Sequence, residues 1–276
     1  MFNGRTRKPK QYKGYRLLAV GGSTLPITSK IKDNKTTIRK TNNSDKPFSA
    51  FYLNTSYDIL EYTYNDVILQ GQAVQDEREA LNKIVKLYKD DKAIFIADRG
   101  YESINSFEKI KLSGNKYLIR VKDIHSTVML RSFELFPDDE FDVQVKRTLT
   151  RKQTNEIKTH PEIYKFVPKN QHFDCFDETS FYDFEYRVVR FKITEDTYEF
   201  IVTNLDKSEF SMQDIKELYH LRWKIKTSYS ELKYDLDLNT LHSKKRNLIE
   251  QEIYAKMLLY NFCGRITNGI NITKKR

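Results

Sequence analysis

The chain has 276 residues, a formal net charge of +10, 39% hydrophobic residues and few glycines or prolines, which is a globular composition and excludes a low-complexity chain. Two distant cysteines exclude a disulfide framework and a cysteine zinc site, and no apolar run is long enough to span a bilayer. We therefore expect a reduced, cytoplasmic protein without a membrane partner. Its basic charge is compatible with nucleic acid as a partner.

The first half of the chain is expected to alternate strands and helices after a basic arm at residues 1–14. The apolar run RLLAV (16–20) predicts a buried strand that ends sharply at Gly21, Gly22 and Ser23. A polar loop should follow at 28–47. The other elements expected in this half are strands at 50–53, 66–70, 93–97 and 116–121 and helices at 76–89 and 103–112. This order predicts an α/β layer architecture.

The second half begins with a change of pattern. Between 122 and 197, alternation such as Phe141, Val143 and Val145 predicts a mostly antiparallel β insertion, and a strand at 198–204 is expected to return to the main sheet. A long helix is predicted at 211–236, where Ser211 and Asp214 form a capping box. Its expected buried face consists of Leu218, Leu221, Ile225, Tyr229, Leu232 and Leu236. A final helix is expected at 248–263.

A polar stripe runs beside the apolar face of the long helix. Tyr219, Arg222, Lys226 and Lys233 are spaced 3, 4 and 7 residues apart, which places them along one side of an α-helix. Such a stripe either lines a cleft against the sheet or is an ordinary solvated shoulder. The spacing alone leaves both interpretations open.

Several motifs resemble IS-four-type insertion-sequence transposases, from about residue 15 to residue 263. The family's catalytic helix carries Tyr, Arg, Glu and Lys at the spacings found in LYHLRWKIKTSYSELKYDL (218–236), where the Glu position is Lys226. The segment AIFIADRGYES (93–103) resembles the strand with the second catalytic Asp, here Asp98. The segment YRLLAVGGSTLPI (15–27) resembles the strand with the first, where this chain has Gly21. The resemblance identifies the chain as similar to a DDE transposase catalytic domain.

The resemblance implies a ribonuclease-H-like α/β fold, a mixed sheet flanked by helices. Residues 15–121 and 198–276 would form the transposase domain, and 122–197 the inserted, mostly antiparallel β subdomain. Members of the family bind transposon ends, hydrolyse a phosphodiester and join the 3′-hydroxyl to target DNA. The implied partner is double-stranded DNA, the implied cofactor is Mg²⁺, and a homodimer is left open. Because family members extend further at both ends, we also expect a truncated chain.

The chain departs from the family at two of the three metal-binding carboxylates. Mg²⁺ binds through carboxylate oxygens, whereas Gly21 offers no side-chain oxygen and Lys226 adds a positive charge in place of a ligand. The metal site at Asp98 is therefore expected to be weak or absent, and strand transfer to be damaged. Tyr219, Arg222 and Lys233 match family positions that contact DNA phosphates, so DNA binding is expected to outlast catalysis.

Three alternatives follow from these departures. The chain is a catalytically impaired transposase remnant, a non-catalytic DNA-binding regulator of an active relative, or an active Mg²⁺ nuclease with an unrecognised ligand set. Asp66 is the best candidate for a substitute ligand. A further hypothesis is that Lys226 forms an ion pair with Asp98 in an empty metal site. Its alternative is that both positions drifted without pairing.

Overall fold

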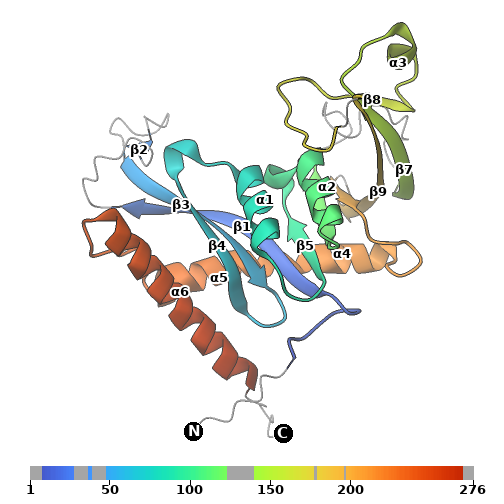
Figure 1. Cartoon of the computed structure of the whole chain (residues 1–276). Coiled ribbons are helices and arrows are strands. Elements are labelled where there is room, and N and C mark those ends of the chain that lie inside the picture. Colours follow the sequence, from blue (N-terminus) through green and yellow to red (C-terminus); the bar gives the residue numbers. More distant parts are fainter. Residues whose placement is uncertain are drawn as a thin grey trace, which may run out of the picture. The chain divides into compact units, whose positions relative to one another are not determined.

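The computed structural model describes residues 8–27, 37–38, 48–122, 140–176, 179–195 and 197–269 (Figure 1). The chain is a mixed α/β protein, as predicted, with parallel and antiparallel strand pairs and flanking helices. It divides into two compact units, Met1–Ile94 with Leu221–Arg276, and Phe95–His220. No helix among the described residues is long and apolar enough to cross a bilayer.

The first unit contains an antiparallel sheet whose central strand, β3, pairs with β1 on one side and β4 on the other. Its strands are β1 (Arg16–Ile27), β2 (Thr37–Ile38), β3 (Phe48–Asp58) and β4 (Thr63–Gly71). The prediction that β1 ends at Gly21 is wrong, because the strand continues to Ile27. A Cβ at Gly22 would overlap the ring of Tyr52. Gly22 therefore permits a close approach within the sheet and does not form a turn.

Helices cover both faces of this sheet. The short turn η1 (Gln72–Val74) leads to α1 (Glu77–Leu87), whose Glu77 accepts a 2.5 Å hydrogen bond from Tyr52 on one face of β3. Successive strand residues point to opposite faces. On the other face, Thr55 contacts α5 (Trp223–Ser230) and Tyr57 contacts α6 (Arg246–Gly269).

The segment predicted as one helix at 211–236 has three parts: α4 (Met212–Leu221), α5, and the π turn η3 (Glu231–Asp235). The predicted capping box is confirmed, since Ser211 N donates to Asp214 Oδ2 at 2.8 Å and Asp214 N donates back to Ser211 Oγ at 3.2 Å. In η3 the Leu236 amide donates to the Glu231 carbonyl, which is the i→i+5 bond of a π turn. The 100° periodicity used to predict the stripe therefore does not extend unchanged through Lys233.

The second unit contains a largely antiparallel sheet of order β6-β10-β9-β7-β8, in which the β7–β8 pair is parallel. Its strands are β6 (Lys116–Val121), β7 (Phe141–Thr150), β8 (Tyr164–Phe166), β9 (Phe181–Thr194) and β10 (Thr197–Thr203), with β5 (Ala93–Ala97) at the boundary between the units. Its other elements are η2 (Arg99–Tyr101), α2 (Ile104–Leu112) and α3 (Asn155–Thr159). The predicted return strand is β10, which pairs with β6. The boundaries 122–197 stay a prediction.

Candidate functional site

Gly21 lies in the middle of β1, opposite Thr55 of β3, with its missing side chain directed toward α5. A Cβ built on Gly21 would be 3.2 Å from Ile225 Cδ1 and 3.7 Å from Tyr229 Cε2. The first distance is tighter than ordinary van der Waals contact, before any carboxylate is added. A side chain at position 21 would therefore begin in contact with Ile225 and Tyr229, and Ile225 would have to give by a few tenths of an ångström.

The main-chain oxygen of Gly21 is also engaged. The hydroxyl of Tyr229 donates a 2.7 Å hydrogen bond to the Gly21 carbonyl, and Thr55 Oγ1 lies 2.7 Å from the same hydroxyl. A phenol has one proton, so Thr55 acts as the donor to the Tyr229 oxygen. Burial raises the pKa of Tyr229, which keeps its hydroxyl protonated and donating.

Lys226, which the resemblance predicts to stand at the Glu position, is exposed on α5 directly after Ile225. Its ammonium lies 4.0 Å from the centroid of the Trp223 ring, and the guanidinium carbon of Arg222 lies 5.4 Å from the same ring. A cation over an indole face is attracted by the negative face of the ring. Trp223 therefore holds two cations at the start of α5.

The three predicted DNA contacts differ in exposure. Tyr219 is 2% exposed and Arg222 is 4% exposed, so both are packed into the interior. Lys233 is half-buried and donates a 2.9 Å hydrogen bond to the Thr24 carbonyl of β1. Burial lowers the pKa of Lys233. Their role as phosphate contacts stays a prediction.

Asp98, which the resemblance predicts to be the second catalytic Asp, follows β5. Its Oδ1 accepts a 3.0 Å hydrogen bond from the Gly100 amide and caps η2. Asp98 belongs to the second unit, whereas Gly21 and Lys226 belong to the first. The convergence of the three positions and the Lys226–Asp98 ion pair therefore both stay predictions.

Asp66, the candidate substitute ligand, lies on the wrong face of the sheet. It is paired with Ser56 of β3 and accepts hydrogen bonds from Ser56 Oγ at 3.0 Å and Asn65 Nδ2 at 2.8 Å. The neighbouring residue Thr55 faces α5, and alternate residues of a strand face opposite ways. Asp66 therefore points away from the side on which α5 covers Gly21.

The residues of this region do not fit a divalent ion. Gly21 supplies no side-chain oxygen, its carbonyl accepts from Tyr229, and the ammonium of Lys226 would repel a cation. Among the residues that the structure describes, no group of three or more His, Cys, Asp or Glu side chains could hold a metal ion. A magnesium site built on these positions would need side chains that the chain lacks there.

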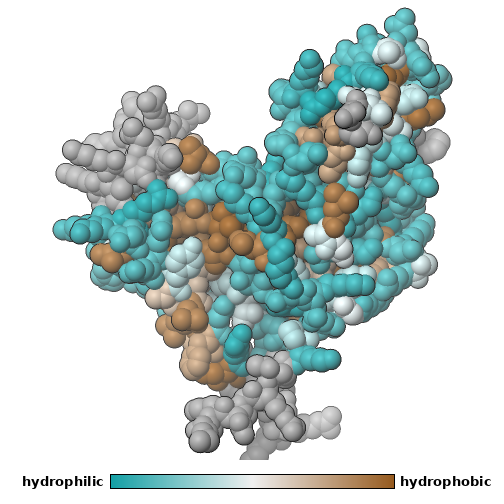
Figure 2. All heavy atoms as spheres, in the orientation of Figure 1, coloured by the Kyte–Doolittle hydropathy of each residue, from teal (hydrophilic) through white to brown (hydrophobic). Residues whose placement is uncertain are grey.

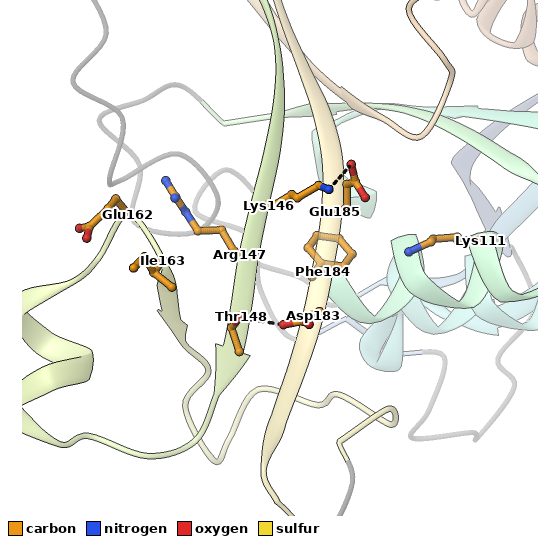
Figure 3. Close-up of a pocket in the computed structure, with 9 residues that line it drawn as sticks. All are labelled: Lys111, Lys146, Arg147, Thr148, Glu162, Ile163, Asp183, Phe184 and Glu185. Carbon is orange, nitrogen blue, oxygen red and sulfur yellow. Dashed lines mark hydrogen bonds and ion pairs between the residues drawn. The ribbon is translucent and has the colours of Figure 1, made fainter.

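A separate groove lies in the second unit, between β7, β9 and α2 (Figure 3). It is lined by Lys111, Lys146, Arg147, Thr148, Glu162, Ile163, Asp183, Phe184 and Glu185. Lys146 lies 3.6 Å from Glu185, and Thr148 donates to Asp183 at 2.8 Å. The groove is lined by both cations and acids, and none of the predicted site residues lines it.

The sequence indicated part of this arrangement. Helical spacing marked Ile225 and Tyr229 as buried, and both are, at 1% and 6% exposure. It did not indicate that they pack on the glycine at the Asp position, because that contact depends on how α5 is placed along β1. Helical spacing gave no signal for Trp223, and its contacts with the two cations were not predicted.

Comparisons with known proteins agree with the resemblance to a DDE transposase, while the IS-four type stays a prediction. The family model for the transposase DDE domain matches residues 12–262. A cryo-EM structure of a piggyBac transposase synaptic complex with hairpin DNA is similar, with a TM-score of 0.51 and 10% sequence identity over 95% of this chain and 48% of that one. The chain thus spans about half the length of that protein. No curated protein matches the sequence.

Proposed function

Since the chain belongs to the transposase DDE domain family, we propose that it acts on DNA in transposition and that its strand-cutting chemistry is impaired. The observation that carries the impairment is the contact at Gly21. A Cβ at that position would lie 3.2 Å from Ile225 Cδ1, and Tyr229 donates to the Gly21 carbonyl.

The chemistry of phosphoryl transfer supports this proposal. Family members that cut DNA hold two divalent ions, about 3.5–4 Å apart, with carboxylates. In this chain the three proposed positions hold Gly21, Asp98 and Lys226, so only one of them has a carboxylate. A lysine charge about 4 Å from a cation costs about 4 kcal/mol per unit charge at an effective dielectric constant near 20, and a divalent ion would feel about twice that.

Double-stranded DNA is the proposed partner. The net charge of +10 favours a polyanion, and binding through phosphates needs no metal ion. We propose Tyr219, Arg222 and Lys233 as phosphate contacts on family grounds. Lys226 adds an exposed cation near them in sequence. A lysine at this position repels a metal ion, and the same charge would attract a phosphate. Because Tyr219 and Arg222 are buried, their contact with DNA requires α4 and α5 to expose them on binding.

The alternative is a non-catalytic DNA-binding remnant that regulates an active relative by occupying its transposon ends. The cations Arg222 and Lys233 are retained while the metal-binding carboxylates are missing, and this favours the alternative as well. Both readings predict binding without cutting. They differ in whether the protein lowers transposition by an active relative when the two are produced together.

Cleavage and binding assays with the whole chain test the proposal. We expect duplex DNA to bind with an affinity that falls as salt rises, and we expect no nicking with Mg²⁺ or Mn²⁺. The logarithm of the DNA-binding constant falls linearly with the logarithm of the salt concentration, and Lys226→Gln should reduce this slope by about one phosphate contact. Lys83→Gln on α1 should leave the slope unchanged. Nicking in Mg²⁺ would overturn the impairment. Failure to bind DNA at low salt would overturn the DNA-binding role.

A further inference from the structure

One arginine of the second unit carries its charge into the interior of the protein. Hydrophilic side chains cover most of the face drawn in Figure 2, where water solvates their charges. The side chain of Arg187 on β9 is instead only 1% exposed. Its guanidinium pairs with the Asp142 carboxylate of β7 through two hydrogen bonds, Nε to Oδ1 at 2.7 Å and Nη2 to Oδ2 at 2.8 Å. A buried charge is costly unless it is paired and hydrogen-bonded, so Arg187 depends on such partners.

The same guanidinium reaches the loop that leads from β10 into α4. Its Nη1 donates to the Leu205 carbonyl at 3.3 Å and to the Phe210 carbonyl at 2.8 Å. From the same loop, Lys207 Nζ donates to the Asp142 carbonyl at 3.0 Å. The Arg187–Asp142 pair therefore ties this loop to β7 and β9 at three points. All of these residues belong to the second unit.

The start of α4 has few other buried contacts. Its first buried residue is Ile215, whereas Ser211 and Gln213 are exposed. Phe210 is fully buried and stands directly before Ser211, which caps the helix. A helix of ten residues is marginal by itself in water, so its tertiary contacts determine where it lies. The hydrogen bond from Arg187 to Phe210 is therefore nearer in sequence to the first turn of α4 than any buried side chain of the helix itself.

Stability alone does not account for a charge at this place. Well-packed apolar side chains of similar volume often replace a buried ion pair without a loss of stability. They would leave the Leu205 and Phe210 carbonyls without the donor that Arg187 supplies. We propose that Arg187 is a positioning residue, through which β7 and β9 fix the start of α4. It thereby fixes the place of Tyr219, the proposed DNA contact seven residues after Met212.

This role rests on the proposed DNA binding and adds to it a requirement for the strands β7 and β9. Tyr219 lies on α4 and in the same unit as Arg187. A helix whose start is loose has to be ordered when DNA binds, and that ordering costs affinity. With the first turn held in advance, this cost is removed, and the movement that exposes Tyr219 is confined to the far end of α4.

Arg187→Lys in the whole chain tests the proposal. Lysine keeps the charge but lacks the planar fork that binds Asp142 and the two carbonyls together. We expect duplex DNA to bind at least about fivefold more weakly, and the amides of residues 211–216 to exchange hydrogen faster. The matched control is Arg16→Lys, which alters the buried Arg16–Asp58 pair of the first unit. It should lower the free energy of unfolding as well, yet leave the DNA affinity and the exchange of residues 211–216 unchanged.

Circular dichroism checks that each variant stays folded. Should Arg187→Lys not fold, Lys207→Met removes one tie from the surface and should still speed exchange in residues 211–216. Unchanged exchange in the variants that fold overturns the proposal. Faster exchange with unchanged DNA affinity also overturns it, because the anchor would then have no part in binding. If the unsubstituted chain binds no DNA, the proposed function fails, and the exchange measurement still decides whether Arg187 holds α4.

Discussion

The Tyr229 hydroxyl of α5 donates a 2.7 Å hydrogen bond to the Gly21 carbonyl of β1, at the position where the family resemblance places the first catalytic carboxylate. The contact is buried and is supported by Thr55 on the neighbouring strand. Strand and helix thus meet through packing and one main-chain hydrogen bond. Substitutions at these positions measure how much of the free energy of unfolding depends on such contacts.

Gly21→Asp is expected to destabilise the protein by at least about 2 kcal/mol, because the new side chain overlaps Ile225 and buries a carboxylate. Urea unfolding measures the change. The loss should be smaller in an Ile225→Ala background, which opens space on α5. If Gly21→Asp left the free energy of unfolding unchanged in both backgrounds, the packing of Ile225 on Gly21 would be contradicted.

Gly21→Asp combined with Lys226→Glu introduces the residues that the resemblance predicts at both positions. We expect no recovery of Mg²⁺-dependent nicking, because a side chain at position 21 is crowded by Ile225 and its carboxylate would be directed at the buried face of α5. A plasmid nicking assay together with calorimetric Mg²⁺ titration gives the answer. Recovered nicking would show that α5 yields and that the slot assignments are right.

Tyr229→Phe should reduce the free energy of unfolding by about 1–3 kcal/mol. It removes the hydroxyl that satisfies the Gly21 carbonyl and accepts from Thr55, and leaves both without this partner in the interior. The matched control is Tyr234→Phe in η3, where the ring is 75% exposed. Equal effects of the two substitutions in chemical denaturation would contradict a role for this hydrogen bond.

Arg16→Met should cost about 3–5 kcal/mol of stability, because it strands a buried carboxylate. Arg16 Nε donates to Asp58 Oδ2 at 2.8 Å, and Asp58 is fully buried where it accepts from the Leu60 and Glu61 amides. For comparison, Lys83→Met breaks a surface pair with Glu79 and should cost less than about 0.5 kcal/mol. Thermal and urea unfolding should rank the two variants in that order.

Acid stability should depend on Asp174. The pKa of Asp174 is lowered, mainly by a hydrogen bond from Lys109. Slight burial raises this pKa, and a hydrogen bond from Asn105 lowers it further. A carboxyl whose pKa is lower in the folded state stabilises the fold above its unfolded pKa, about 3.9, and loses that contribution as the pH falls through the folded pKa. Asp174→Asn should therefore flatten the fall in Tm below about pH 4. Lys109→Met should do the same, whereas unchanged slopes in both would contradict the assignment.

The sequence predicted elements whose burial is set locally. The five consecutive apolar residues of β5 need both faces covered, and all five are buried. The helical spacing of Ile225 and Tyr229 likewise predicted their burial. It could not predict that β1 runs on through Gly21 and Gly22, because glycine suits both a turn and a close approach. The partner that decides between these, Tyr52 or Ile225, lies far away in sequence.

The placement of the site residues was less predictable still. Spacing placed Lys233 with Arg222 on one stripe, but the π turn changes the angular step before Lys233 is reached. No residue type encodes an i→i+5 hydrogen bond. The burial of Tyr219 and Arg222 depends on the packing around α4 and α5, which helical periodicity does not contain.

The wide turn η3 closes the helix that α5 begins. Side chains before it keep the phase of α5, and the helix ends at Leu236, the C-cap of η3. Lys233 lies inside the wide turn, with its ammonium on the Thr24 carbonyl. A relative that is one residue shorter within 231–235 would place a different side chain against β1. A sequence alignment across these residues would then match the family's lysine to a residue one position away from its structural equivalent.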